Sequence, residues 1–126
     1  MAFILVVEDN PLIAKLVRLG LEHSGYAVLV VNDGNAALLA AHEYRPDLIL
    51  LDVLLPGASG FVVLEELKAD PATEAIPVFM LTGQSDGASI LKGLNSGADA
   101  YLSKPIDMAD LLTRIAAALA RPRAAL

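Results

Sequence analysis

Polar residues capable of chemistry follow several short apolar runs of this sequence. They are Glu8 and Asp9, Asp52, Thr82, and Ser103 with Lys104. Carboxylates that share one site repel one another unless a cation neutralises them. An all-oxygen site with few protein ligands and room for water suits Mg²⁺. A carboxylate held beside such a cation can attack a phosphoryl group and form an acyl phosphate. In that chemistry we expect Lys104 to balance the phosphoryl charge and Thr82 to donate a hydrogen bond to it.

The apolar runs that precede these residues indicate strands. They are rich in Val, Ile and Leu and show no polar alternation: Phe3–Val7, Ala27–Val31, Leu48–Leu51, Val78–Leu81 and Ala100–Leu102. A strand with one exposed face alternates between apolar and polar residues, whereas a strand covered on both faces does not. We therefore expect five strands of a parallel sheet that is covered on both sides.

The segments between the runs have the spacing of helices. The first begins at Asn10-Pro11, where proline suits the first helical position because its missing N–H is not needed there. The others cover Asn35–Tyr44, Ser59–Ala69, Ser85–Ser96 and Met108–Ala120, the last capped by Asp107. Regular alternation of strands and helices predicts an α/β protein with helices on both faces of a parallel sheet. Ligands of such sheets bind at the carboxyl edge, where the strand order reverses, so we expect the polar residues to converge there.

Composition narrows the possible partners. The chain has 126 residues, of which 56% are hydrophobic, and a net charge of −6. Such an acidic chain is a poor ligand for nucleic acid or for anionic membranes. Cysteine is absent, which excludes disulfides and thiolate metal sites. The N-terminus lacks the features of a signal peptide, and no apolar stretch is long enough to span a membrane. We expect a soluble, cytoplasmic protein that binds neither nucleic acid nor membranes through this segment.

The polar residues and their spacing resemble the receiver domain of bacterial two-component response regulators. The matching set is Glu8-Asp9, Asp52 with Leu55-Pro56, Thr82, and Lys104-Pro105. Asp9, Asp52, Thr82 and Lys104 are separated by 43, 30 and 22 positions, as in that family. The segment from Gly97 to Pro105 is also similar to the family's last-strand signature. The resemblance implies a flavodoxin-like, doubly wound (βα)5 fold with strand order 2-1-3-4-5.

The resemblance also implies a role for each carboxylate. Asp52 would be the phosphoacceptor and, with Asp9, would bind Mg²⁺ directly. Glu8 would bind the ion through water, and the backbone carbonyl of Leu54 would be a further ligand.

Other residues would contact the phosphoryl group or report its presence. Thr82, Lys104 and the backbone of Gly83 would bind it, and Thr82 and Tyr101 would form the switch. Pro105 resembles the family's cis-proline. The switch would alter the surface formed by Ser85–Ser96 and the region from Ala100 to Ala120.

The implied partners are a sensor histidine kinase or histidine phosphotransfer protein and a downstream protein or effector domain. We expect a receiver domain over residues 1–121, with residues 122–126 as a tail or the start of a linker. Such a domain catalyses its own phosphotransfer and slow dephosphorylation but is not a turnover enzyme.

Other interpretations of the same residues fit less well. A lone Asp after an apolar run is usually a turn residue or a helix cap. A phosphohydrolase with an aspartyl-phosphate intermediate would carry a second Asp two residues after the nucleophile, where this chain has Leu54. A flavodoxin-type electron carrier would need a Ser/Thr-rich phosphate loop after the first strand, where Glu8 and Asp9 would repel a flavin phosphate. No glycine-rich nucleotide-binding motif occurs.

Overall fold

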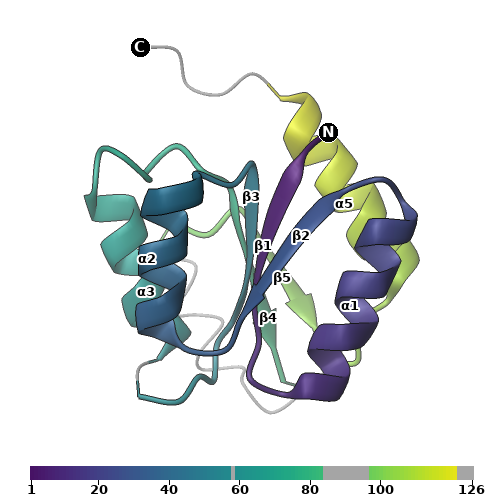
Figure 1. Cartoon of the computed structure of the whole chain (residues 1–126), viewed down its shortest axis with the longest axis horizontal. Helices are drawn as coiled ribbons and strands as arrows, with labels where there is room; N and C mark the ends of the chain where they lie inside the picture. Colours follow the sequence, from purple (N-terminus) through teal and green to yellow (C-terminus); the bar gives the residue numbers. More distant parts are fainter. Residues whose placement is uncertain (58, 84–96, 122–126) are drawn as a thin grey trace.

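The computed structural model describes residues 1–57, 59–83 and 97–121 of the chain (Figure 1). Five parallel strands form one sheet in the order β2-β1-β3-β4-β5. They are β1 (Phe3–Val7), β2 (Ala27–Val31), β3 (Leu48–Asp52), β4 (Val78–Thr82) and β5 (Ala100–Ser103). The expected doubly wound, flavodoxin-like fold and its strand order are confirmed.

Helices cover both faces of the sheet. They are α1 (Pro11–His23), α2 (Gly34–Tyr44), α3 (Gly60–Ala69) and α5 (Met108–Ala120). Figure 1 shows α1 and α5 on one face and α2 and α3 on the other. The helix expected at Ser85–Ser96 and the tail expected at residues 122–126 lie outside the described residues. Within the described ranges, no helix is long and apolar enough to cross a membrane.

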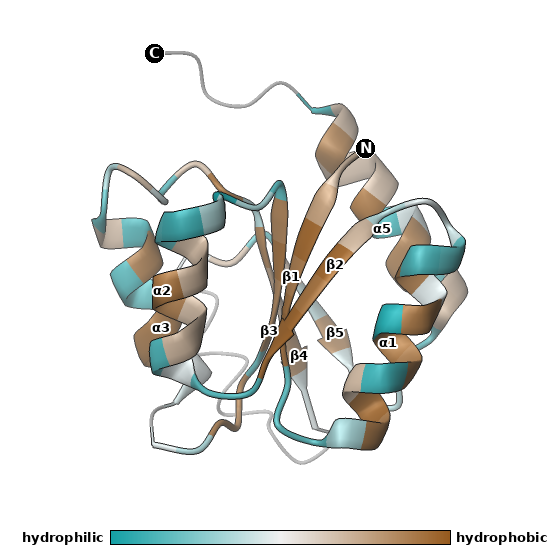
Figure 2. Ribbon diagram, viewed as in Figure 1, coloured by the Kyte–Doolittle hydropathy of each residue, from teal (hydrophilic) through white to brown (hydrophobic). Residues whose placement is uncertain are grey.

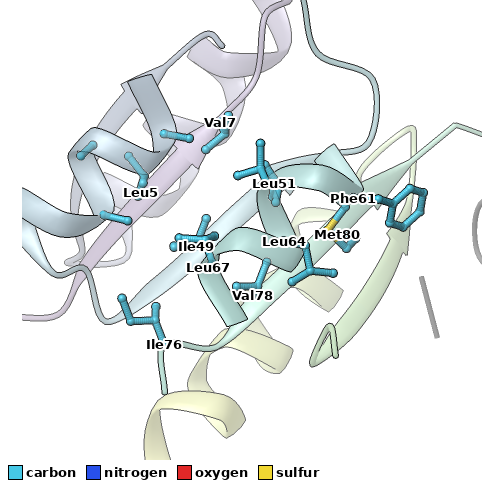
Figure 3. Close-up of a cluster of buried hydrophobic side chains, with 14 of the residues drawn as sticks. Leu5, Val7, Ile49, Leu51, Phe61, Leu64, Leu67, Ile76, Val78 and Met80 are labelled. Atoms are coloured by element: carbon cyan, nitrogen blue, oxygen red, sulfur yellow. The ribbon is translucent and has the colours of Figure 1, made fainter. Parts of the chain in front are cut away.

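The hydrophobic core has two halves, one on each face of the sheet. Alternate residues of each central strand point to opposite faces, so that Leu5 and Val7 join α2 and α3 while Ile4 and Val6 join α1 and α5. Figure 2 shows that the strands are hydrophobic along most of their length, whereas the helices mix hydrophobic and hydrophilic residues. Figure 3 shows the half on the side of α3. Burial on both faces explains why the strand sequences do not alternate.

Side-chain caps fix the start of each described helix near the carboxyl edge of the sheet. Asn10 accepts hydrogen bonds from the amides of the first turn of α1, and Asp33, Ser59 and Asp107 do the same for α2, α3 and α5. A cap satisfies backbone N–H groups that have no partner within the helix. The loops that leave the strands at this edge are therefore anchored where each helix begins.

Candidate functional site

The carboxyl ends of four neighbouring strands bring the expected polar residues to one edge of the sheet. Glu8 follows β1, Asp52 ends β3, Thr82 ends β4 and Lys104 follows β5. These strands pair in register, with Asp52 beside Leu81 and Thr82 beside Ser103. The parallel arrangement thus places residues that are far apart in sequence within reach of one another.

Lys104 links two of the acids. Its Nζ lies 2.8 Å from Oε1 of Glu8 and donates a hydrogen bond of 2.9 Å to Oδ2 of Asp52. The contact with Glu8 is an ion pair. Burial lowers the pKa of Lys104, but the two carboxylates outweigh it and raise the pKa above its ordinary value. Lys104 is therefore a fully charged ammonium held between Glu8 and Asp52.

Glu8, Asp9 and Asp52 form a cluster that can hold a cation. One carboxylate oxygen of each residue lies within 4.8 Å of the others. Glu8 and Asp52 are only 1% and 4% exposed, whereas Asp9 faces solvent. Burial raises the pKa of Glu8 despite the nearby ammonium of Lys104, and the neighbouring carboxylate of Asp52 adds to the rise. A hard divalent cation would relieve this crowding of negative charge.

The donor atoms of this cluster fit Mg²⁺. They are all oxygens, and the exposure of Asp9 leaves room for the waters that Mg²⁺ retains. An open depression beside the cluster is lined by Asp9, Val53, Leu54, Leu55, Pro56 and Ser59. The amide of Leu54 donates to Oδ1 of Asp52 at 3.3 Å, which holds the start of this loop against the carboxylate.

Two buried hydroxyls come from the neighbouring strands β4 and β5. Thr82 is 1% exposed, and its Oγ1 has no hydrogen-bond partner among the described residues. The same holds for the hydroxyl of Tyr101, and burial raises the pKa of this phenol. Tyr101 pairs in register with Met80 and packs against the core cluster of α2 and α3. An unpartnered buried hydroxyl is rare in folded proteins and calls for an explanation.

The structure places the remaining expected residues as follows. Gly83 directly follows Thr82 at the end of β4. The peptide bond between Lys104 and Pro105 is cis. The amide of Lys104 donates to the carbonyl of Thr82 at 2.7 Å, so that β5 and β4 remain joined up to the site.

Gly60 is a residue near the site that the sequence analysis missed. It is the first residue of α3, and its Cα lies against the main chain of Asp52. A glycine just after a Ser cap was the available signal, because glycine is a poor helix former.

Comparison with known proteins decides the family. A model of the response regulator receiver domain matches residues 4–116. The chain belongs to this family. Receiver domains of response regulators are signalling proteins rather than turnover enzymes. Such domains bind Mg²⁺ at an acidic pocket, and an acidic cluster of Glu8, Asp9 and Asp52 is present in this one.

This receiver domain is similar to about half of the length of several proteins named as DNA-binding regulators. The DNA-binding response regulator MtrA of Mycolicibacterium smegmatis is 42% identical over 118 residues, which are 94% of this chain and 50% of MtrA. The DNA-binding dual master transcriptional regulator RpaA of Synechocystis sp. is 42% identical over 118 residues, which are 94% of this chain and 49% of RpaA. The chain spans about half the length of the curated relatives it matches.

Solved structures share the whole fold of this receiver domain. The signal receiver domain of a histidine kinase from Syntrophus aciditrophicus has a TM-score of 0.90 and 33% identity, and the match covers 100% of this chain and 98% of that one. The receiver domain of the sensor histidine kinase PA1611 from Pseudomonas aeruginosa has a TM-score of 0.89 and 31% identity, with 95% and 98% covered. That structure has a magnesium ion coordinated in its active site cleft.

Proposed function

We propose that this receiver domain accepts a phosphoryl group on Asp52, with Mg²⁺ held by Asp9, Asp52, the carbonyl of Leu54 and, through water, Glu8. The observation that carries the proposal is the buried carboxylate of Asp52, held by Lys104 inside an acid cluster and next to the strand that ends in Thr82. Bound Mg²⁺ would supply positive charge to the oxygens of the phosphoryl group.

The residues of the site would divide the transfer between them. A carboxylate oxygen of Asp52 forms a bond to phosphorus as the P–N bond of a phosphohistidine donor breaks. The electron pair of that bond leaves on the imidazole, which takes a proton from solvent. Lys104, already 2.9 Å from Asp52, balances the charge that arrives. Thr82 Oγ1 and the amide of Gly83 donate hydrogen bonds to the new phosphoryl oxygens.

Movement of Thr82 would connect the site to a partner surface. Its hydroxyl has no partner among the described residues, and a phosphoryl oxygen would supply an acceptor that these residues do not. Tyr101 would then turn toward the vacated space, which changes the surface of residues 85–96, β5 and α5. Amide resonances of β5 and α5 should shift when beryllofluoride, a phosphoryl analogue, is added. Shifts confined to residues that line the acid cluster would contradict this switch.

The partners follow from this chemistry. The phosphoryl donor would be a sensor histidine kinase or a histidine phosphotransfer protein. The relatives, about half of whose length this chain covers, are named as DNA-binding regulators. The signal would therefore pass to an effector domain or to a separate protein. Within the chain, the receiver domain would occupy residues 1–121 and residues 122–126 would be a tail or the start of a linker.

The test is phosphorylation by a small donor. Incubation with acetyl phosphate and Mg²⁺ should add one phosphoryl group to the parent, as seen by intact mass, and Asp52→Asn should abolish the addition. Asp33→Asn is a matched control, because Asn preserves the cap of α2 and removes the same charge away from the cluster. Unchanged labelling of Asp52→Asn would show that another residue is the acceptor.

A further inference from the structure

Gly60 stands where helix α3 meets the end of β3. It is buried, and its amide donates a hydrogen bond of 2.8 Å to the carbonyl of Val53. The side chain of Ser59 accepts from the amide of Phe61 at 3.1 Å and fixes the first turn of α3. The loop that begins at Leu54 is thus closed at its base by the contact between Gly60 and Val53.

A side chain at Gly60 would collide with the main chain of the candidate acceptor. A Cβ atom there would overlap the carbonyl oxygen of Asp52 and lie 3.0 Å from both the carbonyl carbon of Asp52 and the Cα of Val53. All three atoms belong to the backbone and cannot rotate aside. Either the start of α3 or the peptide between Asp52 and Val53 would have to move.

Close approach, rather than backbone freedom, is the reason for glycine at this position. The described glycines with positive φ are Gly25, Gly57 and Gly97. Gly60 is not among them and is the first residue of α3. Glycine is also a poorer helix former than alanine, so local structure favours alanine at residue 60. The contact with Asp52 therefore outweighs a helix preference that acts against it.

The peptide between Asp52 and Val53 connects two parts of the site. The carboxylate of Asp52 accepts hydrogen bonds from the Leu54 amide at 3.3 Å and from Lys104 at 2.9 Å, and both distances depend on the orientation of the main chain at Asp52. The carbonyl of Leu54, a proposed ligand of Mg²⁺, belongs to the same loop. A shift of this peptide would move the nucleophile and the metal ligand together.

We propose that Gly60 is a positioning residue for the phosphoacceptor. Its missing side chain lets the start of α3 press against the main chain of Asp52 and fixes the carboxylate of Asp52 and the carbonyl of Leu54 relative to Glu8 and Asp9. This inference rests on the proposed function of Asp52, and its test includes measurements that do not depend on phosphorylation.

The experiment compares two Gly→Ala variants of the full chain. The three atoms nearest to a Cβ at Gly20 would all belong to the side chain of Met108, the nearest being its Cε at 2.6 Å, and this flexible side chain can move away. Gly20→Ala is therefore the matched control. For each protein we would measure the phosphorylation rate with acetyl phosphate at saturating Mg²⁺, the affinity for Mg²⁺ from amide resonances, and the ¹³C resonance of the Asp52 carboxyl without metal.

Gly60→Ala should change all three measurements. Misplacing a reacting group by an ångström can lower a rate about a hundred-fold, and disturbing the groups that orient metal ligands weakens metal binding roughly ten-fold or more. The Asp52 carboxyl resonance should shift in the metal-free protein. Gly20→Ala should keep the values of the parent.

The outcomes separate positioning from stability. Leu67→Ala, a buried substitution at the far end of α3, supplies a destabilised chain with an intact site. A Gly60→Ala protein that loses stability as Leu67→Ala does, but keeps the parent's Mg²⁺ affinity, Asp52 resonance and rate, overturns the inference.

If Gly60→Ala does not fold, Ser59→Ala loosens the same helix start by removing its cap, and parent values for that variant overturn the inference as well. Absence of phosphorylation in the parent itself would contradict the proposed function, while the metal and resonance measurements would still test Gly60.

Discussion

Thr82 carries a buried hydroxyl at the end of β4. Its Oγ1 lacks a partner among the described residues, so its burial has a desolvation cost with no hydrogen bond in return. Thr82→Val keeps the shape of the side chain and removes that cost. We expect the variant to be as stable as the parent or more stable by about 1 kcal/mol, measured by chemical denaturation.

The same substitution should weaken the response to a phosphoryl analogue. Beryllofluoride with Mg²⁺ should raise the melting temperature of the parent more than that of Thr82→Val, because only the parent can donate a hydrogen bond from the side chain of residue 82. Thr113→Val is the control, since the Thr113 hydroxyl is exposed on α5 and bonds to Ala109. Equal responses of parent and Thr82→Val would remove Thr82 from the phosphoryl contacts.

Leu54 should set the lifetime of the phosphorylated state. Its side chain is 67% exposed at the rim of the depression beside the acid cluster, and it cannot orient a water for attack on the acyl phosphate. An amide at this position could hold such a water, and one such contact is worth roughly ten-fold in rate. Phosphorylated Leu54→Asn should therefore lose its phosphoryl group about ten-fold faster than the parent at fixed Mg²⁺.

Val62→Asn provides the comparison for this measurement, because Val62 is also exposed, at 44%, but lies on α3 outside the rim. Its decay should match that of the parent. Decay of Leu54→Asn at the parent's speed would show that the lifetime depends on other groups. A polar side chain two residues after Thr82 could also hold such a water, and that residue, Gln84, lies outside the described residues.

At the scale of elements, the sequence predicted the strands to within one residue of their ends. A strand buried on both faces is a run of apolar residues, and that run is visible without a structure. Three predicted strands ended one residue too early, just before Asp52, Thr82 and Ser103. The backbone pairing between strands continues to these residues although their side chains are polar. The hydropathy of the side chains carries no information about this backbone pairing.

The sequence predicted which residues form the site better than it predicted the contacts between them. The sequence placed Lys104 and Glu8 at the same edge, but their 2.8 Å ion pair depends on side-chain conformations that no spacing determines. Gly60 was missed for a similar reason, since its requirement comes from the close approach of two backbone segments. Residue types and strand ends predict which groups meet, whereas packing decides which atoms touch.

Lys68 of α3 contacts the segments that precede β4 and β5, at the edge of the sheet opposite the acid cluster. From α3 its Nζ donates to the carbonyls of Glu74 and Ile76 at 3.2 and 2.9 Å, and it lies 3.6 Å from Asp99, which accepts from the amide of Val78. Lys68→Met should lower the free energy of unfolding by about 1–3 kcal/mol, since charged hydrogen bonds to these carbonyls are lost.

This loss should leave the chemistry of the site unchanged. The denaturation midpoint of Lys68→Met should fall while its phosphorylation rate stays at the parent's value. Lys15→Met, which removes an exposed lysine of α1, should change neither. A Lys68→Met protein of parent stability would show that the contacts of Lys68 are replaced by water at no cost.

At the scale of the whole molecule, the acid cluster is a local concentration of the negative charge that the chain carries overall. The net charge is −6, and Lys104 pairs with two of the three clustered carboxylates. The buried core on both faces holds these carboxylates together at the sheet edge, so that part of the folding energy opposes their repulsion. The folded protein should therefore bind a divalent cation that the unfolded chain does not, and such binding stabilises the fold.

Mg²⁺ should accordingly raise the melting temperature. At a concentration ten times the dissociation constant the expected gain is about 1.4 kcal/mol, from the linkage of binding to folding, or roughly 3–8 °C for a chain of this size. Asp9→Asn should abolish the rise, because it removes the exposed ligand of the cluster without creating a buried cavity. The metal-free variant should be no less stable than the metal-free parent, since the substitution relieves repulsion.

Glu65→Gln removes an equal charge from the exposed face of α3, outside the cluster, and should retain the full effect of Mg²⁺. A melting temperature of the parent that does not depend on Mg²⁺, or a rise that survives in Asp9→Asn, would contradict a magnesium site at these carboxylates.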